Sequence, residues 1–422
     1  MKYYIKTFGC QMNERDSEKI ESILQENGYE KADIKEADIV IVNSCAVREK
    51  SEKKIFSEIG RIRNLNKKAK FISMGCVAQI FPQKLSKISD VVLGTASIYE
   101  FKNFFNKDFK GIFVSKEMTE SDYIFGHLKS PTAYIDIIYG CDNFCTYCVV
   151  PYTRLREVSR SYNSIIQEIK NAVEIGAKEV ILLGQNVNSY NFDGVNFIGL
   201  LEMVNKIAGV KRIRFVTSHP KDFSEDLAKT ILDLDKVCEH LHLPLQSGSD
   251  RILKLMRRKY NFKEFAQKIE YFRKYNPKGS ITSDIIVGFP RETKEDFKQT
   301  LMALEEIQFD EIYSFKYSNR PFAKAALMPD QISEEEKKER LSIVQDLQSK
   351  ISEQINKRYL GSIQEVLIES KAKAFNQVQA RTRTNKIVNI DNSKLNLNEG
   401  NLVFAKITKL NKHSFNGEIC TN

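Results

Sequence analysis

A chain of 422 residues with 42% hydrophobic and 28% charged residues is long enough for two or three domains with sizeable cores, which excludes a disordered polypeptide. Its eight cysteines are too sparse for a secreted disulfide scaffold, residues 1–6 hold no signal-peptide core, and no apolar run reaches the ~18 residues of a membrane span. We therefore expect a cytoplasmic protein without membrane contact, and its net charge of +10 favours a polyanionic partner.

Residues 1–108 alternate short apolar runs with helical patterns. Strands are predicted at 3–7, 37–42 and 70–74, and a helix is predicted at 16–27. Alternation of this kind indicates a parallel sheet with helices on its faces. We therefore expect a first domain of the α/β class.

A cysteine follows each of these three strands, at Cys10, Cys45 and Cys76. Open parallel sheets bind ligands at the carboxyl ends of their strands, so these thiols are expected to meet at one edge. Gly9 and Gly75 adjoin two of them and would let the backbone approach a bulky ligand. The pattern alone leaves two interpretations open: a shared ligand site, or three small buried residues at strand ends.

The run 140–148 places Cys141, Cys145 and Cys148 within eight residues, directly after the first strand of the next region. Three thiolates at this spacing fit three corners of an iron–sulfur cube and leave the fourth iron open. A zinc site normally takes four ligands in two spaced pairs, and the sequence has no second Cys-x-x-Cys. The spacing resembles the radical S-adenosylmethionine (SAM) superfamily, in which the open iron binds SAM.

Residues 127–357 form the second predicted domain, in which residues 127 to about 328 repeat a strand, a loop and a helix six times and a connecting helix follows. The predicted strands are 133–139, 179–183, 212–216, 240–245, 281–287 and 311–317. Six such units predict a partial (β/α)6 barrel, and the polar segments that follow the strands would lie at the carboxyl rim, where barrel enzymes place their chemistry. Ser333 and Glu336 form a capping-box signal that opens a long connecting helix.

The fourth predicted barrel strand alternates polar and apolar side chains. His240, His242 and Gln246 share the face expected to point into the barrel, and three leucines share the outer face. The histidines are expected to pack and hydrogen-bond near the lumen. A zinc site made with Cys238 is the alternative.

Residues 359–422 form a small strand-rich unit, with strands predicted at 365–368, 386–390 and 402–407. The unit holds nine Lys and Arg residues against five Asp and Glu residues. A small basic β-barrel suits nucleic acid, and a solvated accessory domain is the alternative.

Several motifs resemble one family, the radical SAM methylthiotransferases, in the order in which that family has them. Segments 6–13, 42–48 and 74–79 are similar to the three signatures of its N-terminal domain. Segment 141–154 is similar to its radical SAM core, and residues 359–422 are similar to its TRAM barrel, an RNA-binding module. The resemblance covers almost the whole chain.

The resemblance implies a methylthio transfer to C2 of N(6)-dimethylallyladenosine next to the anticodon of tRNA. It implies two 4Fe–4S clusters, the second with an iron open to a sulfur species, and two SAM molecules per turnover. One SAM would yield the 5′-deoxyadenosyl radical that removes hydrogen from C2, and the other would methylate the sulfur. The first cluster would be held by Cys141, Cys145 and Cys148, and the second by Cys10, Cys45 and Cys76. No side chain is expected to act as a catalytic acid or base.

The resemblance also implies partners and contacts. The expected partners are tRNA, an electron donor such as flavodoxin or ferredoxin, and a sulfur donor or cluster carrier. Tyr147 is expected over the SAM adenine, because its neighbouring cysteine fixes it at the cluster. The other SAM candidates are Gln185, Ser218, Gln246, Asp284 and Gly288, and the candidates for tRNA phosphates are Arg381, Arg383, Asn385 and Lys386.

Three positions depart from the family pattern. Leu155 stands where the family usually has Gly, Phe322 and Ala323 stand where Gly-Thr is usual, and Gln379 belongs to a segment that lacks the usual Gly before its Arg. None of these residues is a thiol. They bear on the loops that shape the substrate pocket rather than on the chemistry.

Other functions remain open at this point. The same reaction on N(6)-threonylcarbamoyladenosine is the nearest alternative, and the segments 11–13 and 149–152 favour the dimethylallyl type. Methylthiolation of a ribosomal protein is a second alternative, against which the basic C-terminal barrel argues. A non-enzymatic iron–sulfur protein that binds RNA is a third, and the six-unit barrel with an open-iron motif argues against it.

Overall fold

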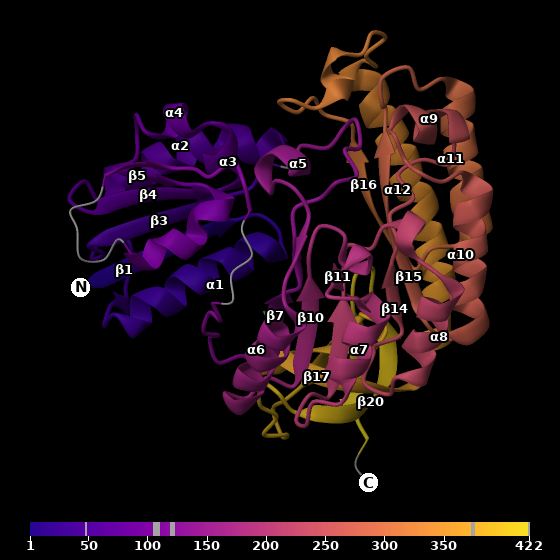
Figure 1. Ribbon diagram of the computed structural model, residues 1–422. Coiled ribbons are helices and arrows are strands. Elements are labelled where there is room, and N and C mark those ends of the chain that lie inside the picture. Colours follow the sequence, from indigo (N-terminus) through magenta and orange to yellow (C-terminus); the bar gives the residue numbers. More distant parts are fainter. Residues whose placement is uncertain (47–48, 104–109, 119–122, 373–375, 421–422) are drawn as a thin grey trace.

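The computed structural model describes residues 1–46, 49–103, 110–118, 123–372 and 376–420, without the side chains of 49–54. Three units follow one another along the chain: a sheet covered by helices, a partial barrel, and a small closed barrel (Figure 1). This is the α/β architecture that the sequence predicts. Residues 47–48 of the second cysteine motif and the predicted domain boundary at residue 108 lie outside the described residues.

The N-terminal unit is a six-stranded parallel sheet in the order β2-β1-β3-β4-β5-β6. Its strands are β1 (Lys2–Phe8), β2 (Glu30–Lys31), β3 (Ile39–Ser44), β4 (Lys70–Gly75), β5 (Val91–Leu93) and β6 (Gly111–Phe113). One face is covered by α1 (Gln11–Glu26) and the 3-10 helix η1 (Thr95–Asn103), and the other by α2 (Glu49–Leu65), α3 (Cys76–Ile80) and α4 (Pro82–Leu85). Both faces are therefore apolar, which explains why β3 is buried along its whole length.

Helix α1 begins at Gln11, not at residue 16 as predicted, and Cys10 is its N-cap. Apart from Met12, the extra residues are polar, so they show no apolar period. Asn13 and Arg15 are nevertheless buried, because this end of the helix packs against the barrel as well as the sheet. Polar residues that are buried by a second domain are invisible to a search for an amphipathic stripe.

The central unit is a partial barrel of six parallel strands. One half consists of β7 (Thr132–Asp136), β10 (Glu179–Leu183) and β13 (Arg212–Phe215), and the other of β14 (His240–His242), β15 (Ser280–Val287) and β16 (Glu311–Lys316). A bridge between Ile213 and Val237 joins the halves. The strands lie close to the predicted ranges, and all six point their carboxyl ends to the same rim.

Each barrel strand is followed by a helix on the outside of the barrel (Figure 1). These helices are α6 (Tyr162–Glu174), α7 (Phe197–Asn205), α8 (Glu225–Asp233), α10 (Phe262–Tyr275), α11 (Lys294–Ile307) and α12 (Glu334–Asn356). Shorter elements in the loops are β8 (Ile138–Tyr139), α5 (Val150–Thr153), β9 (Val158–Ser159), β11 (Asn191–Phe192), β12 (Val195–Asn196), α9 (Asp250–Leu255), and the 3-10 turns η2 (Val187–Ser189), η3 (Pro220–Asp222), η4 (Lys324–Leu327) and η5 (Lys357–Tyr359). The described part of the chain contains no helix that is long and apolar enough to cross a membrane.

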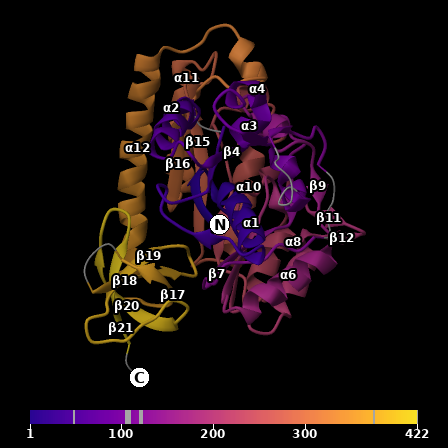
Figure 2. The ribbon, with the colours of Figure 1, turned by 90° about the vertical axis from the view of Figure 1, so that its left-hand side faces the viewer.

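Helix α12 runs along the central unit and ends at the C-terminal barrel (Figure 2). The Ser333 hydroxyl accepts the amide N–H of Glu336, as half of a capping box, while the Glu336 carboxylate pairs with Arg340 instead. The closed barrel has the order β17-β18-β19-β21-β20, with β17 (Ile363–Lys371), β18 (Gln377–Thr382), β19 (Ile387–Asp391), β20 (Leu402–Leu410) and β21 (Phe415–Ile419). Strands β18 and β21 were not predicted, because polar residues such as Gln379 and Asn416 interrupt their apolar pattern.

A buried ionic network joins the N-terminal unit to the barrel. The Glu168 carboxylate on α6 accepts from Arg15 of α1 at 2.8 Å and from Arg160 at 2.6 Å, and His127 lies 3.1 Å away. Burial alone would raise the pKa of Glu168, but the two guanidinium groups and His127 hold it well below its usual range. Breaking such a network would leave unpaired charge in the interior, so the two units are held in one arrangement.

Two of the residues that depart from the pattern of the resembled family have left-handed backbone conformations. Leu155 has φ +67° and Phe322 has φ +65°, and both stand where the family usually has glycine. A side chain costs roughly 1–2 kcal/mol in this region, whereas glycine adopts it freely. The loops have therefore kept the glycine conformation without the glycine.

The first prediction contrasts these two positions. Phe322 is 63% exposed, so Phe322→Gly is expected to relieve strain and raise the free energy of unfolding by about 0.5–1 kcal/mol. Leu155 is buried, and Leu155→Gly is expected to lower stability by about 1 kcal/mol, since lost packing exceeds the relieved strain. Urea unfolding of the two variants measures both values. A gain in stability for Leu155→Gly would contradict this explanation.

Candidate active site with two cysteine sites

The first cysteine site lies between β8 and α5, at the carboxyl rim of the barrel. Each of its three sulfurs accepts one N–H group at 3.4 Å: Cys141 from the side chain of Asn143, Cys145 from Arg258, and Cys148 from the backbone of Val150. Burial raises the pKa of the Cys141 and Cys148 thiols, so donors of this kind are needed to stabilise thiolates there. The arrangement suits a site that binds metal through sulfur.

The backbone before this site requires glycine. Gly140 has φ +69°, and a Cβ atom there would lie 2.0 Å from the carbonyl oxygen of Arg156. The close approach brings the Leu155 carbonyl to the amide of Cys141 at 3.1 Å. A small pocket beside the thiols is lined by Phe144, Cys145, Cys148, Tyr152, Ala323 and Lys324.

Arg258 is the site residue that the sequence analysis missed. It follows α9, far from the cysteine motif in sequence, and no strand-end pattern marks it. Its guanidinium contacts the Cys145 sulfur and the Tyr147 hydroxyl at 3.4 Å each, and the Tyr260 hydroxyl at 2.8 Å. Tyr147 is thereby fixed next to the thiols.

Three of the five predicted rim residues carry buried oxygen atoms without a hydrogen-bond partner in the described part of the chain. These atoms are Oε1 of Gln185, Oγ of Ser218 and Oε1 of Gln246. Folded proteins leave few buried polar atoms unsatisfied, so a cluster of them on three neighbouring loops points to a missing polar ligand. Gln246 has a left-handed backbone at φ +74°, and so does Thr217, the residue before Ser218, at φ +66°. Such conformations in residues other than glycine are typical of functional loops.

The other two rim candidates have no buried oxygen atom of this kind in the described part of the chain. Asp284 lies 3.7 Å from Nε2 of His242. The amide of Gly288 donates to the Glu292 carboxylate at 2.7 Å, and a Cβ atom at Gly288 would lie 2.3 Å from Lys337 on α12. The packing of Lys337 and the left-handed backbone at φ +70° both favour glycine at this position.

The two histidines of β14 are hydrogen-bonded, as their position near the lumen predicts. His240 and His242 both contact the hydroxyl of Thr282, at 3.1 and 3.0 Å. Burial holds the pKa of His240 well below its usual range, so its imidazole is neutral. In the described residues, no three His, Cys, Asp or Glu side chains are arranged around a single metal ion, which argues against zinc on Cys238 and these histidines. An iron–sulfur cube differs, because its thiolates bind separate irons.

The second group of cysteines lies at the carboxyl ends of three adjacent strands, as predicted. Cys10 follows β1, Cys45 follows β3, and Cys76 is the first residue of α3 after β4. Because β1, β3 and β4 are neighbours in the sheet, the three residues share one edge. None of the eight cysteines is in a disulfide.

Two buried asparagines hold the loops of this second site together. Nδ2 of Asn13 donates to Oδ1 of Asn43 at 3.0 Å, and Nδ2 of Asn43 donates to the Asn13 carbonyl at 2.8 Å. Asn13 Oδ1 also accepts from the Cys10 sulfur at 3.4 Å. A Cβ atom at Gly75 would lie 2.2 Å from Asn43 Oδ1, so this network needs glycine before Cys76. The two hydrogen bonds between Asn13 and Asn43 fix the ends of the strands, and thus the spacing of the thiols.

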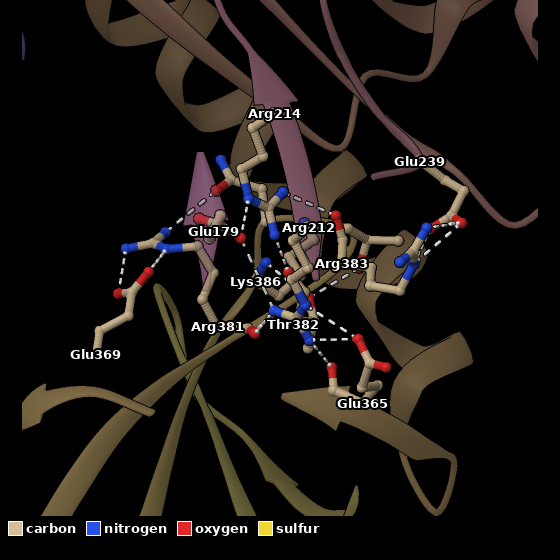
Figure 3. Close-up of polar contacts among 12 residues, drawn as sticks. Glu179, Arg212, Arg214, Glu239, Glu365, Glu369, Arg381, Thr382, Arg383 and Lys386 are labelled. Carbon is tan, nitrogen blue, oxygen red and sulfur yellow. Dashed lines mark hydrogen bonds and ion pairs between the residues drawn. The ribbon is translucent and has the colours of Figure 1, made fainter. Parts of the chain in front are cut away.

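The residues predicted to contact RNA phosphates lie at the end of β18 and in the turn that follows it. The turn between β18 and β19 meets the amino ends of the barrel strands (Figure 3). The cysteines follow the carboxyl end of the first barrel strand, so this is the opposite end of the barrel. Arg381 pairs with Glu369, Arg383 pairs with Glu239, and Lys386 lies 3.7 Å from Asp310. Asn385 Oδ1 accepts from Arg381 at 3.3 Å. The three cationic side chains have acidic partners within the protein, and a count of basic residues does not reveal such pairs.

Two arginines of β13 fasten this interface. Arg212 donates to the Arg381 carbonyl at 2.7 Å and pairs with Glu365 at 2.8 Å. Arg214 donates to the carbonyls of Thr382 and Arg383 at 2.6 and 2.8 Å and pairs with Glu179 at 3.0 Å. Both arginines are buried (Figure 3). The C-terminal barrel is therefore a fixed cap on the lower end of the central unit.

Family profiles match three successive parts of the chain. They are the uncharacterized protein family UPF0004 at residues 2–94, the radical SAM superfamily at 135–304, and the TRAM domain at 357–420. A solved structure described as the radical SAM methyltransferase TsrM from Kitasatospora setae has a TM-score of 0.57 and 13% identity, covering 77% of this chain and 75% of that one. At this identity the likeness concerns the fold.

Curated relatives resemble the whole chain. The tRNA-2-methylthio-N(6)-dimethylallyladenosine synthase of Thermodesulfovibrio yellowstonii is 48% identical, with 99% of this chain and 98% of that protein covered. The protein of the same name from Caldicellulosiruptor saccharolyticus is 43% identical, with 99% and 92% covered. The radical SAM profile implies a 4Fe–4S cluster and SAM as cofactors. The chain belongs to the family of radical SAM tRNA methylthiotransferases that includes the tRNA-2-methylthio-N(6)-dimethylallyladenosine synthases.

Proposed function

We propose that this protein transfers a methylthio group to C2 of N(6)-dimethylallyladenosine in tRNA. The observation that carries the proposal is the presence of two three-cysteine sites, on a barrel rim and on a sheet edge, joined by the short helix α5. One site suits SAM cleavage and the other suits a sulfur-carrying cluster, and a methylthiotransferase needs both. The same-named relatives support the choice of nucleoside.

The first site would hold a 4Fe–4S cluster on Cys141, Cys145 and Cys148. The unpartnered oxygens of Gln185, Ser218 and Gln246 fit the amino and hydroxyl groups of SAM, and Tyr147 lies beside the thiols for contact with its adenine. The cluster and SAM supply the electron transfer and radical chemistry when bound. The side chains of the chain itself bind, orient and exclude water.

The second site would hold an auxiliary 4Fe–4S cluster on Cys10, Cys45 and Cys76, with one iron open to sulfur. Three thiols at one edge, glycines before two of them, and the asparagine network fit such a group. Two SAM molecules per turnover follow from this scheme, since one is spent on the radical and the other on the methyl group.

Binding of tRNA is assigned to the outer face of the C-terminal barrel. Arg383 and Lys386 are paired with acids of the central unit, and Arg381 is paired with Glu369 of its own barrel. Further candidates are exposed side chains of β20, where Lys406 lies next but one to Phe404, a ring that is 57% exposed. Lysine beside an exposed ring is typical of surfaces that bind phosphates and stack bases. We place these events in the cytoplasm, with a flavodoxin- or ferredoxin-like electron donor and a sulfur donor or cluster carrier.

A second prediction separates the two sets of basic residues. Lys406→Gln is expected to reduce the slope of log Kd for tRNA against log salt by about 1, because one phosphate contact is lost. Arg383→Gln is expected to leave that slope unchanged and to loosen the barrel interface. Filter binding between 50 and 200 mM salt measures the slopes. A reduced slope for Arg383→Gln alone would restore the prediction made from the sequence.

The proposed reaction is tested by the stoichiometry of SAM use. Anaerobically reconstituted protein receives reductant, SAM and tRNA that carries N(6)-dimethylallyladenosine, and products are quantified by mass spectrometry. One 5′-deoxyadenosine and one S-adenosylhomocysteine are expected per methylthio group. Matched tRNA that carries unmodified adenosine at this position is the control and should give no methylthio product. Formation of 5′-deoxyadenosine without any methylthio group on either tRNA would contradict the proposal.

A further inference from the structure

Helix α5 links the two cysteine sites through a single arginine. The helix starts beside Cys148, whose sulfur accepts the amide of Val150, and its C-cap is Arg154. The side chain of Arg154 leaves the central unit and enters the N-terminal unit, where Nη1 pairs with Asp16 at 2.7 Å. The preceding carbonyl, that of Thr153, accepts from the Thr95 hydroxyl at 2.5 Å, which fixes α5 against this unit.

Arg154 ends beside the thiols of the second site. Its partner Asp16 lies on α1, the helix that Cys10 caps, and α5 packs against α3, which begins at Cys76. Burial by itself would lower the pKa of Arg154, but Asp16 and the thiols of Cys76 and Cys10 raise it well above its usual value. The guanidinium therefore remains charged in the interior of the protein.

One end of this guanidinium has no acceptor. Arg154 is 4% exposed, and Nη2 is buried without a hydrogen-bond partner in the described residues. A buried cationic donor without an acceptor costs more than an unpaired neutral group, because the charge is also desolvated. Asp16 pairs with the other terminal nitrogen, Nη1, so this ion pair leaves Nη2 without an acceptor.

A second arginine of the central unit reaches the same edge. Nη1 of Arg320, in the loop after β16, donates to the carbonyl of Ala46 at 3.3 Å, next to Cys45. Two buried guanidinium groups thus contact the segments that carry Cys10 and Cys45, and both come from the unit that carries the first site. Positive charge at this place favours an anion in addition to three thiolates.

We propose that Nη2 of Arg154 donates a hydrogen bond to a sulfur anion, sulfide or methanethiolate, that is bound at the site of Cys10, Cys45 and Cys76. This assignment rests on the proposed function. Arg154 is then a binding residue for the sulfur that is transferred, and its attachment to the Cys148 segment keeps that sulfur facing the first site. Lysine cannot replace it fully, because one ammonium group lacks the planar fork that serves Asp16 and sulfur together.

The test uses a parent protein with Cys141, Cys145 and Cys148 replaced by alanine, so that only the auxiliary cluster is present. Sodium methanethiolate is titrated into the reduced protein, and the EPR spectrum of the cluster gives the Kd. Arg154→Met is expected to raise this Kd roughly 10- to 100-fold, the value of a hydrogen bond to a charged group. Arg154→Lys is expected to raise it several-fold. Arg160→Lys is the matched control: it alters a buried arginine that pairs with Glu168, and the Kd should not change.

The outcomes separate this inference from the proposed function. A parent protein without about four irons would contradict the second cluster itself. A parent with four irons and an unchanged Kd in Arg154→Lys would overturn the role of Arg154 alone. Should Arg154→Met fail to assemble its cluster, the Lys variant decides, because it keeps the charge beside Asp16. An equal rise in Kd for Arg160→Lys would likewise overturn the role, since the effect would then be general loosening.

Discussion

Replacing Cys141, Cys145 and Cys148 together by alanine is expected to halve the iron content of anaerobically purified protein, from about eight atoms per chain to about four. The same loss is expected when Cys10, Cys45 and Cys76 are replaced, because each group holds one cluster. The two variants should differ in chemistry. The first should no longer cleave SAM reductively, whereas the second should still form 5′-deoxyadenosine but no methylthio product. Iron analysis and product assays measure both.

The chain provides its own control for this experiment. Cys238 is buried between β13 and β14, Cys420 follows β21, and neither lies in the two sites. The Cys238→Ala and Cys420→Ala variants should keep about eight irons. Four irons in the unaltered protein, or a loss of all iron from either triple variant, would contradict two independent clusters.

The Arg214→Met variant is expected to lose about 3–5 kcal/mol of stability at the interface with the C-terminal barrel. Arg214 and Glu179 are 3% and 0% exposed, so the variant leaves a buried carboxylate without its principal partner. Two backbone carbonyls, those of Thr382 and Arg383, also lose their donor. Hydrogen exchange in the β18–β19 segment should accelerate, and the urea midpoint should fall.

The double variant Arg214→Met/Glu179→Leu tests the cause of this loss. If the unpaired charge is the main cost, the double variant should regain a large part of the stability, because apolar replacements of both partners are well tolerated. Lys406→Met, an exposed change on the same barrel, should have little effect. Equal instability of the single and the double variant would show that the hydrogen bonds to the carbonyls, not the buried charge, hold the interface.

Much of this fold could be predicted from the sequence because the cues are local. The alternation of strands and helices gave the barrel and the sheet, and the rule for carboxyl ends brought Cys10, Cys45 and Cys76 to one edge. The early start of α1 was missed, because its polar first turns are buried by another unit. The apolar period of a helix shows which face packs on its own domain, and it does not show a second domain that packs on a polar face.

The functions of charged residues were harder to predict, since pairing depends on the tertiary structure. The basic composition of residues 359–422 suggested phosphate contacts at Arg383 and Lys386, and it gave no sign that Glu239 and Asp310 from the central unit lie next to them. Arg154 stood in a recognised motif, yet its proximity to Asp16 could not be read from a separation of 138 positions. The sequence identifies the charged residues that could bind a ligand, and the fold decides which of them already have a partner within the protein.

Nucleoside mass spectrometry of tRNA is the most direct measurement of the central claim. Total tRNA is compared between cells of the source organism with and without this gene, and between deletion cells that express the unaltered chain or the Cys10→Ala variant. Loss of 2-methylthio-N(6)-dimethylallyladenosine, with accumulation of N(6)-dimethylallyladenosine and rescue by the unaltered chain alone, is the predicted result. Loss of only the methylthiolated threonylcarbamoyl nucleoside, with the dimethylallyl product unchanged, would contradict the account.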